Sequence, residues 1–157
     1  MPARAGHLRG EIVSAISALL LAVTMFALAW YGVDGVPGRT ARLVGTENAW
    51  QGLSVLRWLM LATIVAALAA APLRLGGRSN GARPNTGALV MLLGTATSAV
   101  LIYRVLIALP SPDEVVDQKL GAFLAVVWAL GIAYGGLESL RDERAAAAAT
   151  QARMRSA

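Results

Sequence analysis

Two arginines, Arg57 and Arg104, are the residues of this chain best placed to do chemistry, because both interrupt long apolar stretches. Arg57 follows Trp50 by seven residues, and Arg104 comes shortly before Pro110. At 1.5 Å per helical residue, both would lie roughly 8 to 10 Å inside the same membrane boundary. Charges at such depth are costly and usually face a helix bundle or a wet cavity. The guanidinium fork fits phosphate or carboxylate, which predicts a shared site for an anion or a lipid headgroup.

A structural role would explain the same two arginines with fewer assumptions. Each side chain could extend toward the outer interface, with its stem in the apolar region. Each could also pair with an acid of the outer loops, and these acids are Asp34, Glu47, Asp113, Glu114 and Asp117. Such pairs would hold the glycine-rich segment 32–49 over the bundle. Both interpretations remain open from the sequence.

The rest of the chain offers little for catalysis. It contains no cysteine, and its one histidine, His7, lies in the N-terminal tail, so thiolate chemistry and a multi-histidine metal site are excluded within one chain. Serines and threonines of the apolar stretches have no His or Lys beside them for activation. We therefore expect no enzyme, no cofactor and no metal. A weaker hypothesis is an enzyme that uses the arginines with Asp34 and Glu47 on a lipid-linked substrate.

Four apolar stretches must position these residues. They cover about 12–31, 53–73, 87–109 and 120–137, in a chain that is 57% hydrophobic with a mean hydropathy of +0.60. A bilayer core of about 30 Å needs about 20 apolar residues per helix. The pattern predicts an all-α, up-down bundle of four transmembrane helices over residues 12–140. Residues 1–11 would form a basic tail, and residues 141–157 a second, Ala/Arg-rich tail.

The basic residues indicate how this bundle is oriented. Nine would lie on the side of the two tails: Arg4, Arg9, Arg74, Arg78, Arg83, Arg141, Arg144, Arg153 and Arg155. Three would lie opposite: Arg39, Arg42 and Lys119. Because cytoplasmic flanks are rich in Arg and Lys, both ends are predicted to be cytoplasmic. The net charge of +5 thus reflects anionic lipid rather than nucleic acid as the partner.

The first apolar stretch could instead be a signal peptide, with Ala27-Leu28-Ala29 as a cleavage site. Its apolar run exceeds the usual 7–15 residues. Cleavage would also leave Trp30 and Tyr31 at the new terminus, and these aromatic residues fit an interfacial anchor better. A membrane span is the preferred interpretation.

Several local signals predict helix ends and contacts. Asn48 and Gln51 have the spacing of a capping box and would begin the second helix. Pro72 and Gly76-Gly77 would end it. Ser111-Pro112-Asp113-Glu114 predicts a start near Pro112 for the fourth helix. Segment 32–49 shows no strand pattern. Small residues four apart, which let helices approach closely, predict packing at Gly94, Ser98, Gly131 and Gly135.

Several short motifs are spread along the chain: Trp30-Tyr31-Gly32, Ala49-Trp50-Gln51-Gly52-Leu53-Ser54, Tyr103-Arg104, Gly121-Ala122-Phe123-Leu124, and Gly135-Gly136 before Arg141-Asp142-Glu143. With these, the chain resembles a loose group of small four-span membrane proteins of actinobacteria that has no assigned activity. The resemblance implies a bacterial source and a four-span fold, and it implies no function.

We therefore expect a multi-pass protein of a bacterial cell membrane. The leading hypothesis is a non-enzymatic accessory or scaffold subunit that packs against another membrane protein or forms a homo-oligomer. The alternative is a lipid- or anion-binding protein, transport-related in one version, that uses Arg57 and Arg104.

Overall fold

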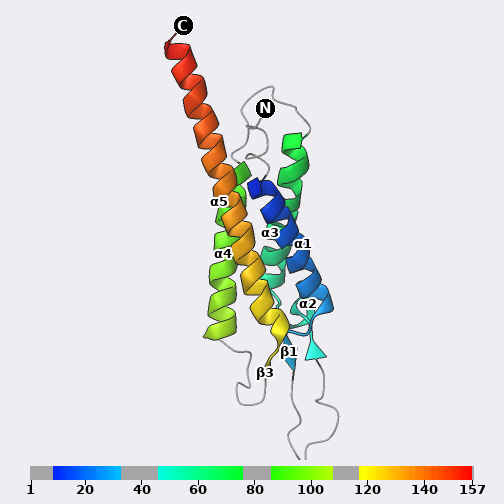
Figure 1. Cartoon of the computed structure of the whole chain (residues 1–157). Coiled ribbons are helices and arrows are strands. Elements are labelled where there is room, and N and C mark those ends of the chain that lie inside the picture. Colours follow the sequence, from blue (N-terminus) through cyan, green and yellow to red (C-terminus); the bar gives the residue numbers. More distant parts are fainter. Residues whose placement is uncertain (1–8, 33–45, 76–85, 108–116, 157) are drawn as a thin grey trace, which may run out of the picture.

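A computed structural model describes residues 9–32, 46–75, 86–107 and 117–156 (Figure 1). Helices dominate these segments, as the sequence predicts. The elements in chain order are α1 (Arg9–Ala27), β1 (Tyr31–Gly32), β2 (Thr46–Glu47), α2 (Ala49–Gly52), α3 (Leu56–Leu75), α4 (Thr86–Leu106), β3 (Asp117–Gln118) and α5 (Leu120–Arg155).

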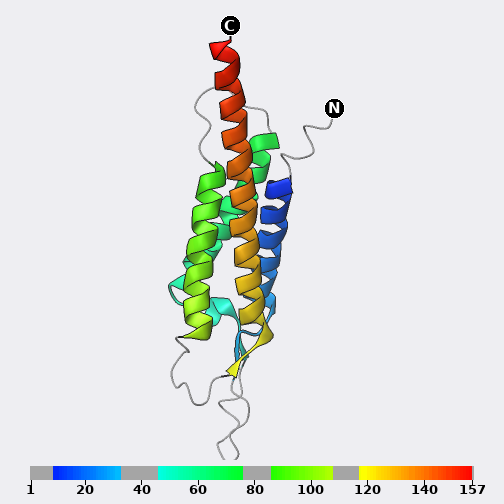
Figure 2. The same ribbon diagram turned by 60° about the vertical axis from the view of Figure 1, so that its left-hand side comes forward.

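The four long helices lie side by side, and each contacts two others. α5 packs along α1 and α4, and α3 packs along the same two helices (Figures 1 and 2). α1 begins and α5 continues outward at one end, which we call the tail end. The three short strands gather at the opposite end, which we call the sheet end. Helices in contact run in opposite directions along the molecule.

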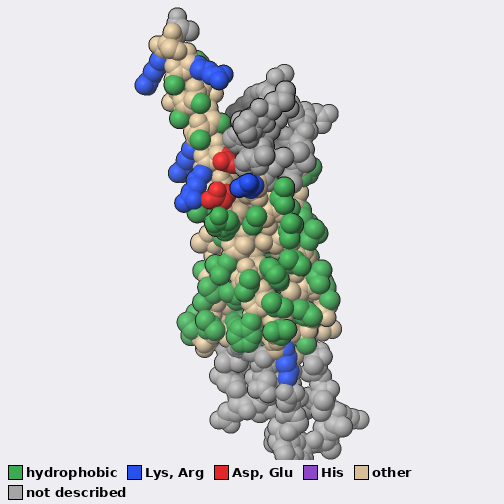
Figure 3. Space-filling model, in the orientation of Figure 1, with side chains coloured by type: hydrophobic (Ala, Val, Ile, Leu, Met, Phe, Trp, Pro, Cys, Tyr) green, Lys and Arg blue, Asp and Glu red, His purple; other side chains and the backbone are tan. Residues whose placement is uncertain are grey.

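Three of these helices are long and apolar enough to cross a membrane: within the described residues these are α1, α4 and α5. The apolar part of α3, Leu56–Ala70, is shorter than these three helices. The middle of the molecule carries apolar side chains on its surface, while the charged side chains in view lie toward the two ends (Figure 3). The exterior includes Ile16, Val65, Leu92 and Val127, each more than half exposed. Such a surface suits hydrocarbon better than water.

Glycine lets α5 approach its neighbours closely. A Cβ atom at Gly94 of α4 would lie 2.7 Å from the backbone nitrogen of Ala133 in α5. A Cβ atom at Gly135 would lie 2.7 Å from the backbone nitrogen of Ser14 in α1. Gly131 faces the Ser17 side chain, so the glycines marked by the sequence are all at helix contacts inside the molecule.

The capping box at Asn48 is present, but the helix that it begins is short. The Asn48 side chain accepts a hydrogen bond from the Gln51 backbone nitrogen at 3.0 Å, and Gln51 accepts one from the Asn48 backbone nitrogen at 3.3 Å. The chain turns extended at Leu53, and α3 starts only at Leu56. The prediction of one helix from Asn48 onward is therefore wrong.

The end of this helix was predicted from Pro72 together with Gly76-Gly77, and α3 continues through Pro72 as far as Leu75, the residue before Gly76. Proline removes one backbone hydrogen bond and crowds the preceding turn, which a helix end near a membrane boundary tolerates.

A small antiparallel sheet, which the sequence did not predict, closes the sheet end. β1 is the central strand: Tyr31 pairs with Glu47 of β2 on one side and with Gln118 of β3 on the other. Because β3 occupies Asp117–Gln118, α5 begins at Leu120 and not near Pro112 as predicted. The capping signal Ser111–Glu114 lies outside the described residues.

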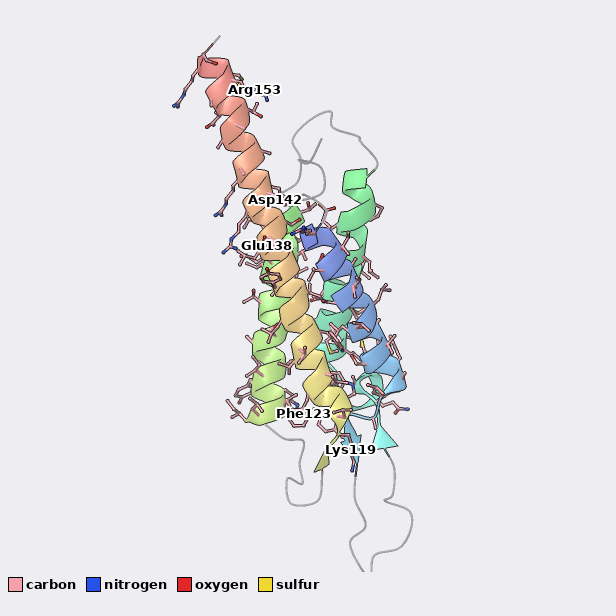
Figure 4. All side chains as sticks on the ribbon, in the orientation of Figure 1. Lys119, Phe123, Glu138, Asp142 and Arg153 are labelled. Carbon is pink, nitrogen blue, oxygen red and sulfur yellow. The ribbon has the colours of Figure 1, made fainter. Side chains whose placement is uncertain are left out.

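The last helix is far longer than a membrane span. Its 36 residues correspond to about 54 Å. Glu138 and Asp142 lie near the start of α1, whereas Arg153 lies well beyond the other described helices (Figure 4). All side chains from Arg144 to Ser156 are exposed. The predicted Ala/Arg-rich tail is helical as far as Arg155.

Candidate functional site

Arg57 lies at the sheet end between two tryptophans. Its guanidinium carbon lies 5.1 Å from the ring centre of Trp50 and 5.6 Å from that of Trp58. The two indoles meet edge to face at 5.6 Å, and Phe26 of α1 contacts Trp50 at the same distance. We call Arg57, Trp50 and Trp58 the indole cradle. Trp50 comes from α2 and Trp58 from α3, two helices separated by the extended Leu53.

The two indole rings stabilise the Arg57 guanidinium, but much of the hydrogen-bonding capacity of this guanidinium is unused. The faces of the neutral rings attract a guanidinium through the negative electrostatic potential of their π electrons, by about 0.5–2 kcal/mol depending on desolvation. Nη1 of Arg57 donates to the Trp50 carbonyl oxygen at 3.3 Å. Nε of Arg57 is buried and has no hydrogen-bond partner among the described residues. Such buried donors are rare in proteins, so this edge of the guanidinium is suited to an acceptor.

Arg104 has a different neighbour, the buried Tyr31 of β1. Tyr31 is 5% exposed, and its hydroxyl makes no well-formed hydrogen bond within the described part of the chain. Burial raises the pKa of the Tyr31 phenol above its usual 10.0, and the nearby positive charge of Arg104 opposes this rise. Arg104 therefore acts on Tyr31 electrostatically, from the last turn of α4.

The structure thus gives the two arginines separate surroundings at the same end of the molecule. Of the acids predicted to pair with them, Asp34, Asp113 and Glu114 lie outside the described residues. Glu47 and Asp117 contribute backbone to β2 and β3, on either side of β1, and their side chains are not described. The predicted charge pairs stay a prediction.

The sequence interpretation missed a second polar region, at the tail end. Glu11 is only 5% exposed and lines a crevice to which all four long helices contribute. Its other lining residues are Ser14, Ala70, Thr86, Gly87, Val90, Gly136 and Ser139. Next to it, Glu143 of α5 accepts hydrogen bonds from the Gly87 backbone nitrogen at 3.1 Å and from the Thr86 hydroxyl at 3.4 Å. Glu143 thereby caps the N-terminus of α4.

The signal that could have revealed Glu11 was its place on α1. Ser14 and Ala18 form part of a small-residue stripe, and Glu11 precedes Ser14 by three residues on the same helical face. A carboxylate on this packed face is buried between helices. Among the described residues, no group of His, Asp and Glu has the arrangement of a metal site.

No protein-family model, curated protein or solved structure matches this chain. Function must therefore be argued from the chain itself. Of the two polar regions, the indole cradle combines a cation, half-exposed aromatic rings and an unpartnered donor. The tail-end crevice is narrow, and its side chains hold helix ends together. The cradle is the stronger candidate for binding a ligand.

Proposed function

We propose that this chain is a multi-pass protein of a bacterial cell membrane, built as a four-helix transmembrane bundle with its tail end in the cytoplasm. In this role α3 would cross the membrane beside α1, α4 and α5, all of which are long and apolar enough to do so. The excess of arginine on the tail-end segments supports the orientation. The resemblance to small membrane proteins of actinobacteria is in keeping with this location.

Within that membrane, the chain would serve as a non-enzymatic accessory subunit. The observation that carries this proposal is the projecting part of α5, from Arg144 to Ser156, where every side chain is exposed. Isolated helices of this length are marginal in water, even when rich in alanine. A partner protein that packs on this part of the helix would stabilise it. The small residues within the bundle are less available to a partner protein, because Gly94, Gly131 and Gly135 already contact neighbouring helices.

A truncation tests the accessory role. The full chain and a chain ending at Glu143 would be expressed in the source membrane, extracted in mild detergent and examined by native mass spectrometry. We expect a stoichiometric protein partner with the full chain and its loss after truncation, while thermal stability of the bundle is kept. A partner that is retained by the truncated chain, or a full chain that is always alone, would contradict the proposal.

A second candidate function is binding of an anion or an acidic lipid through Arg57 and Arg104. The unpartnered Nε of Arg57 and the Tyr31 hydroxyl beside Arg104 favour it. In the proposed orientation both arginines belong to the outer leaflet. Acidic lipid that copurifies with the lone bundle, and is lost in the Arg57→Gln, Arg104→Gln double variant, would support this function over the accessory role.

A further inference from the structure

We propose that the indole cradle binds one phosphate group, with Arg57 as the ligating residue and Trp50 and Trp58 as its walls. This inference rests on the second candidate function and narrows it to one arginine and one ligand chemistry. The phosphate could belong to a lipid headgroup in the leaflet at the sheet end, or it could be a free phosphate ion.

The geometry of Arg57 points to an acceptor that approaches the guanidinium edge-on with two oxygens. The two indoles lie 5.1 and 5.6 Å from the guanidinium carbon, so contacts over the ring faces are already made. Nη1 is used by the Trp50 carbonyl oxygen. The edge that contains Nε remains, and Nε is buried without a partner in the described segments. Two parallel N–H donors on one guanidinium edge match two oxygens of a phosphate.

The surroundings of the cradle indicate where that phosphate would come from. Trp58 is 56% exposed, and Phe26, which contacts Trp50, is 50% exposed. Both lie at the sheet end of the apolar surface. Indole rings favour the level of the headgroups, with their apolar faces toward the acyl chains. Because α3 starts only at Leu56, Arg57 lies in its first turn and not roughly 8 to 10 Å inside the boundary, so an arginine held there by two indoles is level with lipid phosphates.

The cradle also holds the cation in place before any ligand arrives. An exposed arginine loses side-chain entropy when it binds an anion. Here the rings and the bond to the Trp50 carbonyl restrict Arg57 in advance. Preorganisation of this kind raises affinity because less order must be imposed on binding.

Fluorescence titration of the purified full chain in a neutral detergent tests the inference. The probes are a short-chain phosphatidylglycerol, inorganic phosphate, and the matching diacylglycerol, which lacks phosphate. Trp50 and Trp58 report binding. We expect saturation with at least one phosphate-containing probe and none with diacylglycerol. Saturation with phosphatidylglycerol alone identifies a lipid site, and saturation with inorganic phosphate alone identifies a free-anion site.

Variants assign the binding to Arg57. Arg57→Gln should weaken phosphate binding about tenfold or more, because it removes both the charge and the fork. Arg57→Lys keeps the charge, so it should fold if Arg57→Gln does not, and it should still bind more weakly than the parent chain. Lys119→Gln removes a positive charge at the same end and should leave the affinity within about twofold.

Two results would overturn the inference. One is equal phosphate affinity in the parent chain, in Arg57→Lys and in Arg57→Gln. The other is affinity that falls in Arg104→Gln but not in the Arg57 variants. The second result would still support anion binding by this chain, but at Arg104. The experiment therefore distinguishes a wrong site from a wrong function.

Discussion

The side-chain oxygens of Thr63 and Thr97 lie 2.7 Å apart, where α3 meets α4. Both residues are almost completely buried, at 1% and 0% exposure. The Thr63 hydroxyl donates to the Leu59 carbonyl oxygen at 2.8 Å, so Thr97 must donate the hydrogen bond to Thr63. Apolar packing alone gives helices little reason to associate inside lipid. This hydrogen bond therefore stabilises the packing of α3 against α4.

Replacing either threonine by valine tests that contribution. Each single variant should destabilise the bundle by about 0.5–1.5 kcal/mol, with Thr63→Val the costlier because it leaves the Thr97 hydroxyl without its acceptor. The double variant should cost less than the sum of the two. Unfolding in mixed detergent micelles measures these energies, with the exposed Thr95→Val as the control. Additive single effects would show that the two hydroxyls do not interact.

Gly135→Val should destabilise the packing of α1 against α5. The new Cβ would lie 2.7 Å from the Ser14 backbone nitrogen and 2.9 Å from the Ser14 Cβ, and backbone cannot move aside cheaply. Overpacking costs about 1–3 kcal/mol or more, while replacing a helical glycine returns at most about 1 kcal/mol. The cost of overpacking should therefore exceed the gain in helix propensity. Thermal melting in detergent should show a lower transition temperature for Gly135→Val and little change for Ala99→Val on the exposed surface of α4.

Glu143→Gln should weaken the cap on α4. The carboxylate accepts hydrogen bonds from Gly87 and Thr86 at the positive end of the helix dipole. Loss of its charge should cost about 0.5–2 kcal/mol. Glu138→Gln is a matched control on the same helix, because Glu138 pairs with Arg141 at the surface, where a salt bridge contributes little. Hydrogen exchange at the first turn of α4 should rise in the Glu143 variant alone.

Tyr31 should make the stability of the fold sensitive to alkali. Burial raises the pKa of Tyr31 above 10.0, although Arg104 opposes the rise. The folded protein thus holds this proton more tightly than the unfolded chain does. The resulting stability is present below pH 10 and is lost as pH rises through the folded-state pKa.

Melting curves between about pH 9 and pH 12 check this behaviour, and so does absorbance of the ionised phenol. Tyr31→Phe should lose less stability than the parent chain over this range. At neutral pH it should stay within about 1 kcal/mol of the parent, because the hydroxyl makes no well-formed hydrogen bond to lose. Tyr103→Phe, at an exposed position, is the control. Identical alkaline profiles for the parent and Tyr31→Phe would contradict the assignment.

The helical class and three long apolar helices could be predicted from the sequence, because hydropathy over about 20 residues is a strong signal. The strands could not, because two residues such as Tyr31–Gly32 show no period and their partners are distant in the chain. Pro72 by itself does not mark the end of α3, which continues to Leu75, next to Gly76-Gly77. A single lost backbone bond does not end a helix that tertiary packing supports. The fourth span and the orientation stay predictions.

At the candidate site, the sequence marked Arg57 and Arg104 but not their surroundings. Trp50 was expected on the same continuous helix as Arg57, but it lies in α2, before the extended Leu53, and its ring packs against the guanidinium of Arg57 in α3. Tyr31 reaches Arg104 from a strand that had no sequence signature. Charges in apolar stretches can therefore be recognised from composition, whereas their partners depend on turns.

The central position of β1 has a consequence for biosynthesis. β1 meets β2 soon after α1 has been made, but its other edge must wait for Gln118, which leaves the ribosome only after α3 and α4. Until then Tyr31 and Gly32 present unsatisfied backbone groups on one side. The sheet that β1 and β2 begin is thus completed only by β3, the strand directly before α5.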